Sequence, residues 1–462
     1  MSRPYHLTIA EAGTNLRDGA ITSAALTEAY LDRIATIDRE LNCFITLLAE
    51  EAREAALEAD REIAAGRWKG PLHGVPIGLK DIYATAGVRT TCHSHLLENN
   101  VPTEDAETVA RLKAAGAIII GKLATHEFAF GGPSFDLPWP PARNPWNPDH
   151  VPAGSSSGSG AAVSAGLCAG AMGSDTGGSI RSPAGVCGIA GFKPTYGLLS
   201  RRGIYPLSWT QDHAGPMART VEDCALMMQA LAGYDPLDPG SVETAVPDFV
   251  GALGRSVRGL RIGLVRSWHE GVADAEVCDA IEQAAGLLRQ EGAEVRDVTL
   301  PDIADFHACG RIIILSEAWT IHRDAVTATP EKYGEFFRNR VRLGASLNAD
   351  HYIEAQRMRR RLTAETMAAM EDCDILLAAN QYGPAERFED SQRPFPFFSK
   401  PYLTMPFNIT GQPALTVPAG FGVNGLPFGI QFAGRPFEDD VVLQVGHTYE
   451  HARGDFDFRP PV

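Results

Sequence analysis

The chain has 462 residues, of which 44% are hydrophobic and 21% charged, a balance typical of a globular protein with enough apolar material for a core. Its formal net charge of −16 opposes binding to nucleic-acid backbones, which depends on clustered lysine and arginine. No run approaches the roughly 20 apolar residues that span a bilayer, and the N-terminus lacks an apolar signal segment. We therefore expect no nucleic-acid partner, no membrane partner and a cytoplasmic location.

The first seventy residues have helical periodicity. Apolar residues recur every three or four positions from 22 to 37, and a second helix is predicted from 50 to about 65. The pattern then changes in HGVPIGLKDIY (73–83), where apolar positions alternate with Gly, Pro or Lys as in a strand with one buried face. We expect Lys80 on the opposite face of that strand.

Strands and helices alternate along the rest of the chain. Residues 105–122 predict a helix and a strand, 154–173 a loop and a closely packed helix, and 259–300 a β-α-β unit. The charged, helical stretch 302–372 predicts a peripheral insertion, and 407–434 returns to strands. This order predicts one α/β domain over 1–462, with a mixed central sheet covered by helices on both faces. Within it we distinguish an N-terminal helical segment (1–70) and a catalytic core (71–220).

The eight cysteines are scattered without a CxxC pair or a Cys/His cluster of metal-ligand spacing. Such a distribution is typical of reduced thiols in a protein core. We expect neither disulfides nor a metal site.

The stretch GSDTGGSIRSP (173–183) places Ser179 directly after two glycines, and three common glycine motifs do not explain it. A P-loop requires a lysine after these glycines, and none is present. The dinucleotide fingerprint fails at 158–163, where Ala-Ala-Val stands in place of the third glycine. The nucleophile elbow fails because Arg181 replaces its final glycine.

A serine hydroxyl is a weak nucleophile at its ordinary pKa, so Ser179 requires a base. No histidine lies within twenty positions of it, although folding can bring His126, His150 or His213 close. Lys80 is the other candidate. Burial at the end of an apolar strand disfavours the charged ammonium group and makes a lysine usable as a base.

Three blocks of sequence resemble the successive blocks of the amidase signature family: GVPIGLKD (74–81), GSSSGSGAAVSAG (154–166) and GSDTGGSIRSPAGVCGIAGFKPTYG (173–197). The resemblance extends over nearly the whole chain, through GKLATHEFAFG, NPWNP, DHAGPMART and FNITGQPALTVPAGF. It implies that 1–462 forms one amidase signature domain with an α/β/α layered fold. It also implies the activity of a serine amidohydrolase.

That family uses a Ser-cisSer-Lys triad, which carries over to three positions of this chain. Ser179 matches the nucleophile, Ser155 the cis-serine and Lys80 the base, while Ser156 matches a supporting serine that hydrogen-bonds around the lysine. In this arrangement the Ser155 hydroxyl passes the proton of Ser179 to neutral Lys80. It later returns a proton to the leaving amine.

The DTGG turn before the nucleophile predicts an oxyanion hole. Backbone N–H groups of Thr176, Gly177 and Gly178, with that of the nucleophilic serine, can converge on the oxygen of a tetrahedral intermediate. Asp175 and Arg181 flank this turn at family positions. We expect them to orient the turn through an ion pair rather than to react.

The substrate pocket is less sharply predicted. Phe128, Phe130, Tyr205, Trp209 and Gln211 are candidates for its lining, and a role in the core explains them equally well. The chain departs from the family pattern at positions 93 and 153 and in AANQYGP (378–384). These departures predict a pocket edge peculiar to this protein.

The resemblance implies an amidase that cleaves the C–N bond of a carboxamide through an acyl-enzyme, without a metal or organic cofactor. The same intermediate allows aryl amides, esters and carbamates (urethanes). The segment SRRGIYPLSWTQDH (200–213) is more similar to free-standing amidases, so we expect a monomer or homodimer acting on a small-molecule amide. Two alternatives remain open: the glutaminase subunit of a tRNA-dependent amidotransferase, and a catalytically silent scaffold.

Overall fold

The computed structural model describes residues 3–391, 400–454 and 458–462. Within them one mixed sheet of 11 strands forms the centre, in the order β1-β3-β2-β4-β6-β5-β10-β11-β9-β7-β8. The strands are β1 (Phe44–Leu47), β2 (Pro76–Lys80), β3 (Ile118–Leu123), β4 (Gly170–Asp175), β5 (Ala190–Lys193), β6 (His213–Ala218), β7 (Arg261–Leu264), β8 (Glu294–Asp297), β9 (Ile375–Ala379), β10 (Ala414–Phe421) and β11 (Pro427–Gly434).

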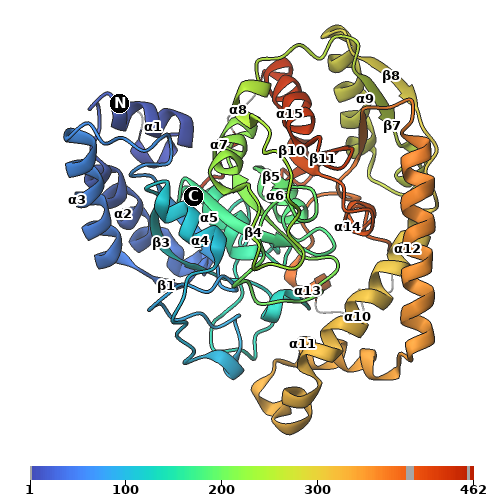
Figure 1. Ribbon diagram of the computed structural model, residues 1–462, viewed down its shortest axis with the longest axis horizontal. Helices are drawn as coiled ribbons and strands as arrows, with labels where there is room; N and C mark the ends of the chain where they lie inside the picture. Colours follow the sequence, from blue (N-terminus) through green and yellow to red (C-terminus); the bar gives the residue numbers. More distant parts are fainter. Residues whose placement is uncertain (1–2, 392–399, 455–457) are drawn as a thin grey trace.

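Helices flank this sheet on both faces, so the predicted α/β class with a mixed sheet is confirmed (Figure 1). The α-helices are α1 (Ile9–Arg17), α2 (Ser23–Leu41), α3 (Ala49–Ala64), α4 (Glu107–Ala114), α5 (Ser157–Ala165), α6 (Arg181–Cys187), α7 (Val221–Leu231), α8 (Phe249–Ala252), α9 (Ala275–Gln290), α10 (Ile303–Ala328), α11 (Glu335–Val341), α12 (Ala349–Ala369), α13 (Phe388–Ser391), α14 (Pro406–Ile409) and α15 (Asp439–Arg453). In Figure 1 the chain begins with α1, α2 and α3 at the left margin.

The strands that carry the predicted site lie in the middle of the sheet. β2 runs parallel to both β3 and β4, and β4 pairs with β6 in the antiparallel sense. All five residues of β2 are buried, including Lys80. The expectation that 73–83 buries one face only was therefore wrong, because layers of the fold cover both faces of the central strands.

The helices of the predicted peripheral insertion are α10, α11 and α12, which lie along the lower and right-hand margin of Figure 1. α10 also buries a row of side chains beneath its outer surface, among them Phe306, Ile313 and Glu317. One side of this layer therefore belongs to the interior of the domain.

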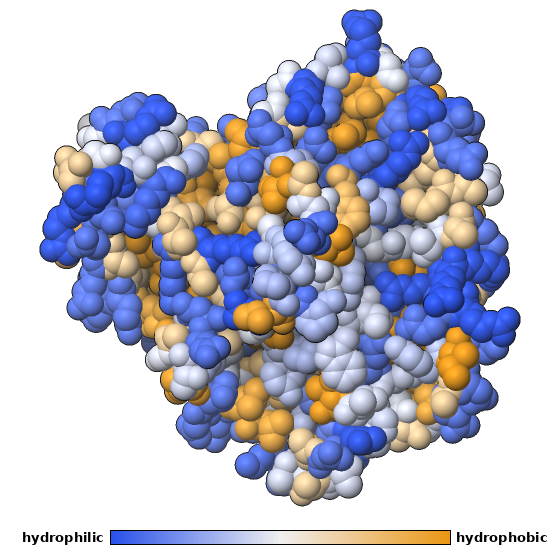
Figure 2. Space-filling model, viewed as in Figure 1, coloured by the Kyte–Doolittle hydropathy of each residue, from blue (hydrophilic) through white to orange (hydrophobic). Residues whose placement is uncertain are grey.

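The surface is largely hydrophilic, with small scattered apolar patches on the face seen in Figure 2. None of the helices that the structure describes is both long and apolar enough to cross a membrane. All eight cysteines are free, and all but Cys278 are buried, as predicted for core thiols.

Candidate active site

Lys80 ends β2 with its ammonium group inside the protein, where two hydroxyls accept its hydrogen bonds. Its Nζ donates to Ser155 Oγ at 2.6 Å and to Ser174 Oγ at 2.8 Å. Burial lowers the pKa of Lys80 from about 10.5 to about 7, against the opposing effect of the Asp175 and Asp212 carboxylates. Near neutral pH a large fraction of Lys80 is therefore uncharged and able to accept a proton.

A second buried lysine holds the backbone that follows Lys80. Lys122 Nζ, from β3, donates to Tyr83 O and Thr90 Oγ1, both at 2.6 Å, and lies 3.3 Å from Asp81 Oδ1. The other carboxylate oxygen of Asp81 accepts from the Thr91 backbone at 2.9 Å and from its hydroxyl at 2.5 Å. These bonds fix the end of β2.

Ser155 lies just before α5, and the Gly154–Ser155 peptide bond is cis, as the family resemblance implies. The backbone N–H of His126 donates to Ser155 O at 3.0 Å. Gly154 is required here because a Cβ at this position would lie 2.1 Å from the His126 ring.

Ser156 is placed differently from the expectation. Its Oγ donates to Ser174 O and accepts from Ser174 N, both at 3.2 Å, so it contacts the backbone of β4 rather than Lys80. The second hydroxyl on the lysine belongs to Ser174 itself. Because β2 and β4 pair in parallel, with Leu79 opposite Met172, the next residues of β4 lie beside Lys80.

Ser179 occupies the turn between β4 and α6, and its carbonyl accepts from Ser156 N at 3.2 Å. Ser155 and Ser179 line the same cavity of about 570 Å³. Within the described residues the Ser179 hydroxyl makes no hydrogen bond to Ser155. Catalytic hydrogen bonds are often long without substrate and tighten only when it binds.

Asp175 and Arg181 form a fully buried ion pair around this turn, with Arg181 Nη2 3.0 Å from Asp175 Oδ1 and Nε 3.0 Å from Oδ2. Asn408, from α14, donates to the same carboxylate at 2.8 Å. Burial alone would raise the pKa of Asp175, but Arg181 and these hydrogen bonds hold it below the usual range. The carboxylate therefore stays ionised and acts as an anchor for the turn.

This anchor corrects one part of the predicted oxyanion hole. The Gly178 N–H donates to Asp175 Oδ1 at 2.8 Å, so it is not free to bind a substrate oxygen. Within the described residues the N–H groups of Thr176, Gly177 and Ser179 have no hydrogen-bond partner. Gly178 is sterically necessary, because it has φ +129° and a Cβ there would lie 2.0 Å from Thr404 Oγ1, whereas a Cβ at Gly177 would come closest to the flexible end of Met405, at 3.0 Å.

Two further carboxylates, those of Asp212 and Glu317, hold the turn at residues 175–178 in place through hydrogen bonds; we call this turn the oxyanion turn. Asp212 accepts from Thr176 Oγ1 at 2.6 Å and from the N–H groups of Leu207 and Ser208 at 2.9 and 3.0 Å. Glu317, on α10, accepts from Ser208 Oγ at 2.6 Å and from the Tyr352 hydroxyl on α12 at 2.7 Å. The helices of 302–372 are thus connected through the 207–212 loop to the turn that precedes Ser179.

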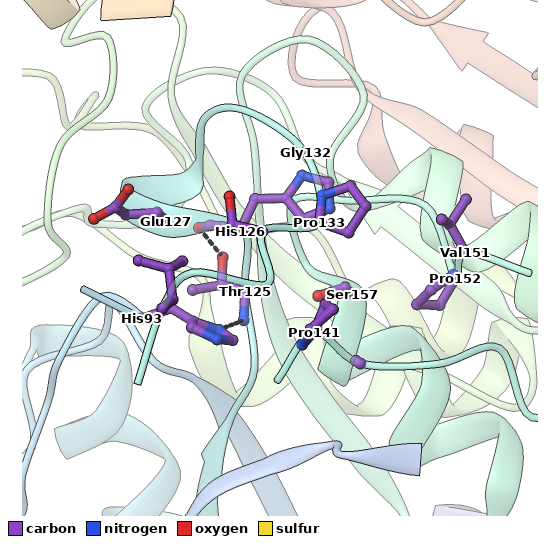
Figure 3. Close-up of a pocket in the computed structure, with 13 residues that line it drawn as sticks. His93, Thr125, His126, Glu127, Gly132, Pro133, Pro141, Val151, Pro152 and Ser157 are labelled. Carbon is purple, nitrogen blue, oxygen red and sulfur yellow. Dashed lines mark hydrogen bonds between the residues drawn. The ribbon is translucent and has the colours of Figure 1, made fainter. Parts of the chain in front are cut away.

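The three histidines that folding could have placed at the site differ in position. His126 lines the cavity, whereas His150 and His213 do not. Burial, and then the Lys80 charge, lower the pKa of His126 to about 3, so its imidazole is neutral at physiological pH. In Figure 3 His126 also borders a small adjoining pocket, where Thr125 Oγ1 donates to His126 O at 3.0 Å. The Ser155 hydroxyl is hydrogen-bonded to the Lys80 amino group and not to a histidine ring.

The predicted pocket residues are only partly brought together. Phe130 lines the cavity, while Phe128 packs inside an aromatic cluster with Tyr205 and other rings. Tyr205 and Trp209 line a neighbouring pocket of about 230 Å³, and Gln211 is fully buried. The core explanation holds for Phe128 and Gln211, because neither side chain reaches the cavity.

The departures from the family pattern lie where the sequence predicted a distinctive edge. Ala153 and residues 380–384 line the cavity, whereas position 93 belongs to the adjoining small pocket. Several other lining residues were not predicted, including Arg340 on α11, Thr404 and Met405. No local signal marks them, since they come from segments more than 150 residues beyond the nucleophile.

The family model described as Amidase matches residues 25–443 of the chain. A glutamyl-tRNA(Gln) amidotransferase subunit from Roseiflexus sp. (strain RS-1) is 40% identical to it over 97% of both chains. Among solved structures, the native peptide amidase from Stenotrophomonas maltophilia has a TM-score of 0.85 at 34% identity, covering 99% of this chain and 98% of that one. An inhibitor-bound chain from a vestigial protein complex, described as revealing the origins of an s-triazine catabolic enzyme, has a TM-score of 0.91 at 33% identity, covering 97% and 99%.

The chain belongs to the amidase signature family. It is therefore an amidase-family enzyme that acts on carbon–nitrogen bonds. We predicted a free-standing monomer or homodimer that acts on a small-molecule amide without nucleic acid. The relatives at 38–40% identity contradict this prediction, because their name is that of one subunit in a tRNA amidotransferase. The expectation of no nucleic acid was based on net charge, which describes this chain alone and says nothing about the surface of a partner. The expectation of a free-standing enzyme was based on the single segment 200–213.

Proposed function

We propose that the chain is the glutaminase subunit of a tRNA-dependent amidotransferase, and that it hydrolyses the side-chain carboxamide of glutamine through an acyl-enzyme on Ser179. The 2.6 Å hydrogen bond between Lys80 Nζ and Ser155 Oγ, beside the cavity that contains Ser179, carries the chemical part of the proposal. The 40% identical relative, whose name is that of such a component, supports the biological part.

In the first step Ser179 Oγ attacks the carboxamide carbon. Its proton moves to the Ser155 hydroxyl while the Ser155 proton moves to neutral Lys80, so the net transfer is from Ser179 to the lysine. The pKa of about 7 for Lys80 makes this transfer accessible near neutral pH. The carbonyl oxygen becomes an oxyanion, which the unpartnered N–H groups of Thr176 and Gly177 can stabilise.

The second step expels the amine. The Lys80 ammonium returns its proton through Ser155 to the leaving nitrogen, which departs as ammonia, and the acyl group remains on Ser179. A water molecule then attacks the ester by the same proton route, giving glutamate and free Ser179. One relay thus serves acylation, leaving-group departure and deacylation.

The cavity suits a substrate of this class. Its volume of about 570 Å³ lies within the range for small-molecule sites, and the Arg340 side chain on its wall is 5% exposed. A buried guanidinium in the wall suits a substrate with a carboxylate beyond the reacting amide, because arginine binds carboxylates in bidentate geometry. Glutamine has such a carboxylate.

The test is ammonia release from glutamine by the tagged chain purified from its native host together with whatever partner proteins accompany it. We expect glutaminase activity, co-purification with a tRNA-binding protein, and loss of activity in Ser179→Ala and Lys80→Ala. An aryl anilide, an ester and a carbamate serve as competing substrates. Cleavage of one of these with no turnover of glutamine would contradict the glutaminase assignment while leaving the triad intact. Absence of both turnover and labelling by a fluorophosphonate would instead identify a silent scaffold.

A further inference from the structure

A second cavity, of about 350 Å³, lies away from the active site and is bordered by arginines. We call it the arginine pocket and define it by Arg219, Arg453, Arg459 and His6. These residues come from the end of β6, from α15, from the C-terminal segment and from the N-terminus. The arrangement is unusual in a chain whose net charge is −16.

The guanidinium groups of Arg219 and Arg453 have no carboxylate partner within the described residues. Arg219 Nη2 donates to Tyr5 O at 3.2 Å, and its buried Nε has no hydrogen bond to any residue that the structure describes. Arg453 donates to Pro418 O and lies 4.4 Å from the centre of the Phe458 ring. Arginines that are partly shielded from water normally pair with a carboxylate, so two half-buried guanidinium groups without one can bind an added anion.

Three arginines and one histidine border the pocket, together with two acidic residues, Glu11 and Glu450. Burial, and then Arg459, Arg219, Arg33 and Arg3, lower the pKa of His6 to about 4. Glu11 is engaged at its own helix start, where its carboxylate accepts from Thr8 N at 2.9 Å. Glu450 accepts from Val221 N at 3.0 Å, and burial raises its pKa to about 8, which leaves it mostly protonated at pH 7.

We infer that the arginine pocket binds a small multivalent oxyanion, a molecule with phosphate or carboxylate groups. Guanidinium groups bind both kinds of oxyanion through paired, charge-assisted hydrogen bonds. The volume suits a small molecule rather than a polymer. The apolar rim formed by Tyr449, Phe458 and Val417 can contact the body of such a ligand.

This site is distinct from the catalytic cavity. His213, at the start of β6, pairs with Asp175, while Arg219 follows Ala218 at the other end of the strand. Six strand residues at about 3.4 Å per residue place the two ends roughly 17 Å apart. The α6 helix spans the same interval, because it begins two residues after Ser179 and ends next to Gly188 of the arginine pocket.

Isothermal titration of the full chain with inorganic pyrophosphate, inorganic phosphate and citrate tests the inference. We expect one site per chain for pyrophosphate or citrate, with the tighter of the two showing whether phosphate or carboxylate is preferred. Affinity should fall at least about tenfold in Arg219→Gln and in Arg453→Gln, since each removes a charge-assisted hydrogen bond. Arg360→Gln, an exposed change of equal charge on α12, should bind as the unmodified chain does.

Two further variants keep the experiment decisive. Arg453→Lys retains the charge and should bind more tightly than Arg453→Gln, even if packing against Phe458 is weakened. Arg340→Gln, in the catalytic cavity, should retain binding. The inference is overturned if none of the three anions binds at millimolar concentration, if the two glutamine variants at 219 and 453 bind unchanged while folded by circular dichroism, or if binding is lost in Arg340→Gln instead.

Discussion

Replacing Lys80 with methionine should make the fold more stable, and the gain should shrink as pH rises. The pKa of Lys80 is about 7 in the folded chain against 10.5 for an ordinary lysine, because burial disfavours its charge. Between these values the unfolded chain binds a proton that the folded chain has released, so the stability of the unmodified protein increases with pH. This contribution is lacking below pH 7 and complete above pH 10.5.

The magnitude follows from the two pKa values. Neutralising Lys80 costs about 4 kcal/mol at pH 7 and about 2 kcal/mol at pH 9. Lys80→Met removes this cost at both pH values, and it also leaves the Ser155 and Ser174 hydroxyls without their donor, a loss of about 1–3 kcal/mol that does not depend on pH. The stability difference between Lys80→Met and the unmodified chain should therefore change by about 2 kcal/mol between pH 7 and pH 9, and this change reports the ionisation of Lys80 alone.

The assay is the melting midpoint of both proteins, measured between pH 6.5 and 10 at one scan rate, because unfolding of a chain this long is often irreversible. An unfolding entropy of roughly 2.1 cal/mol/K per residue gives about 1 kcal/mol/K for the whole chain, so the two curves should converge by roughly 2 °C from pH 7 to pH 9. Parallel curves over this range would mean that Lys80 has an ordinary pKa in the folded state, contrary to this prediction.

Three further predictions concern the turn around the nucleophile. Gly178→Ala should lower kcat/KM at least about 100-fold, because its Cβ would lie 2.0 Å from Thr404 Oγ1. Gly286→Ala, whose Cβ would meet no other part of the chain within 4 Å outside its own helix backbone, should leave kcat/KM unchanged, and equal values for the two variants would contradict the steric explanation. Asp212→Asn should reduce kcat about tenfold with little change in KM, because it weakens the hydrogen bond that Asp212 accepts from Thr176 Oγ1. The rate of acylation, measured in a single turnover, checks this decrease. Arg181→Met should destabilise the fold by about 3–5 kcal/mol, because it leaves the buried Asp175 carboxylate unpaired. The melting midpoint should therefore fall by roughly 3–5 °C. A midpoint within about 1 °C of that of the unmodified chain would contradict this prediction.

The sequence predicted the parts of the site that lie on contiguous stretches. The glycines before Ser179 and the apolar run that ends at Lys80 each have a local physical reason, namely a tight turn and a buried strand. Parallel pairing of β2 with β4 then brings the two stretches together. The mixed sheet and its flanking helices followed from the alternation of patterns.

What the sequence did not predict depends on long-range packing. The loss of Gly178 N–H as an oxyanion donor arises because Asp175 turns its carboxylate back onto that group, which no spacing rule reveals. Thr404 and Asn408 reach the turn from more than 200 residues away. Phe128 and Gln211 were ambiguous because aromatic and amide side chains suit both a core and a pocket.

The proton relay from Ser179 through Ser155 to Lys80 is tested most directly by the pH dependence of Ser179 modification. The rate of covalent labelling by a fluorophosphonate, followed by intact mass and peptide mapping, reports the nucleophile and its base without requiring the natural substrate. We expect a single adduct on Ser179, a labelling rate that rises with pH through an apparent pKa of about 7, and a rate at least about 100-fold lower in Lys80→Ala and Ser155→Ala. An adduct on another residue, or the same pH profile retained in Lys80→Ala, would contradict it.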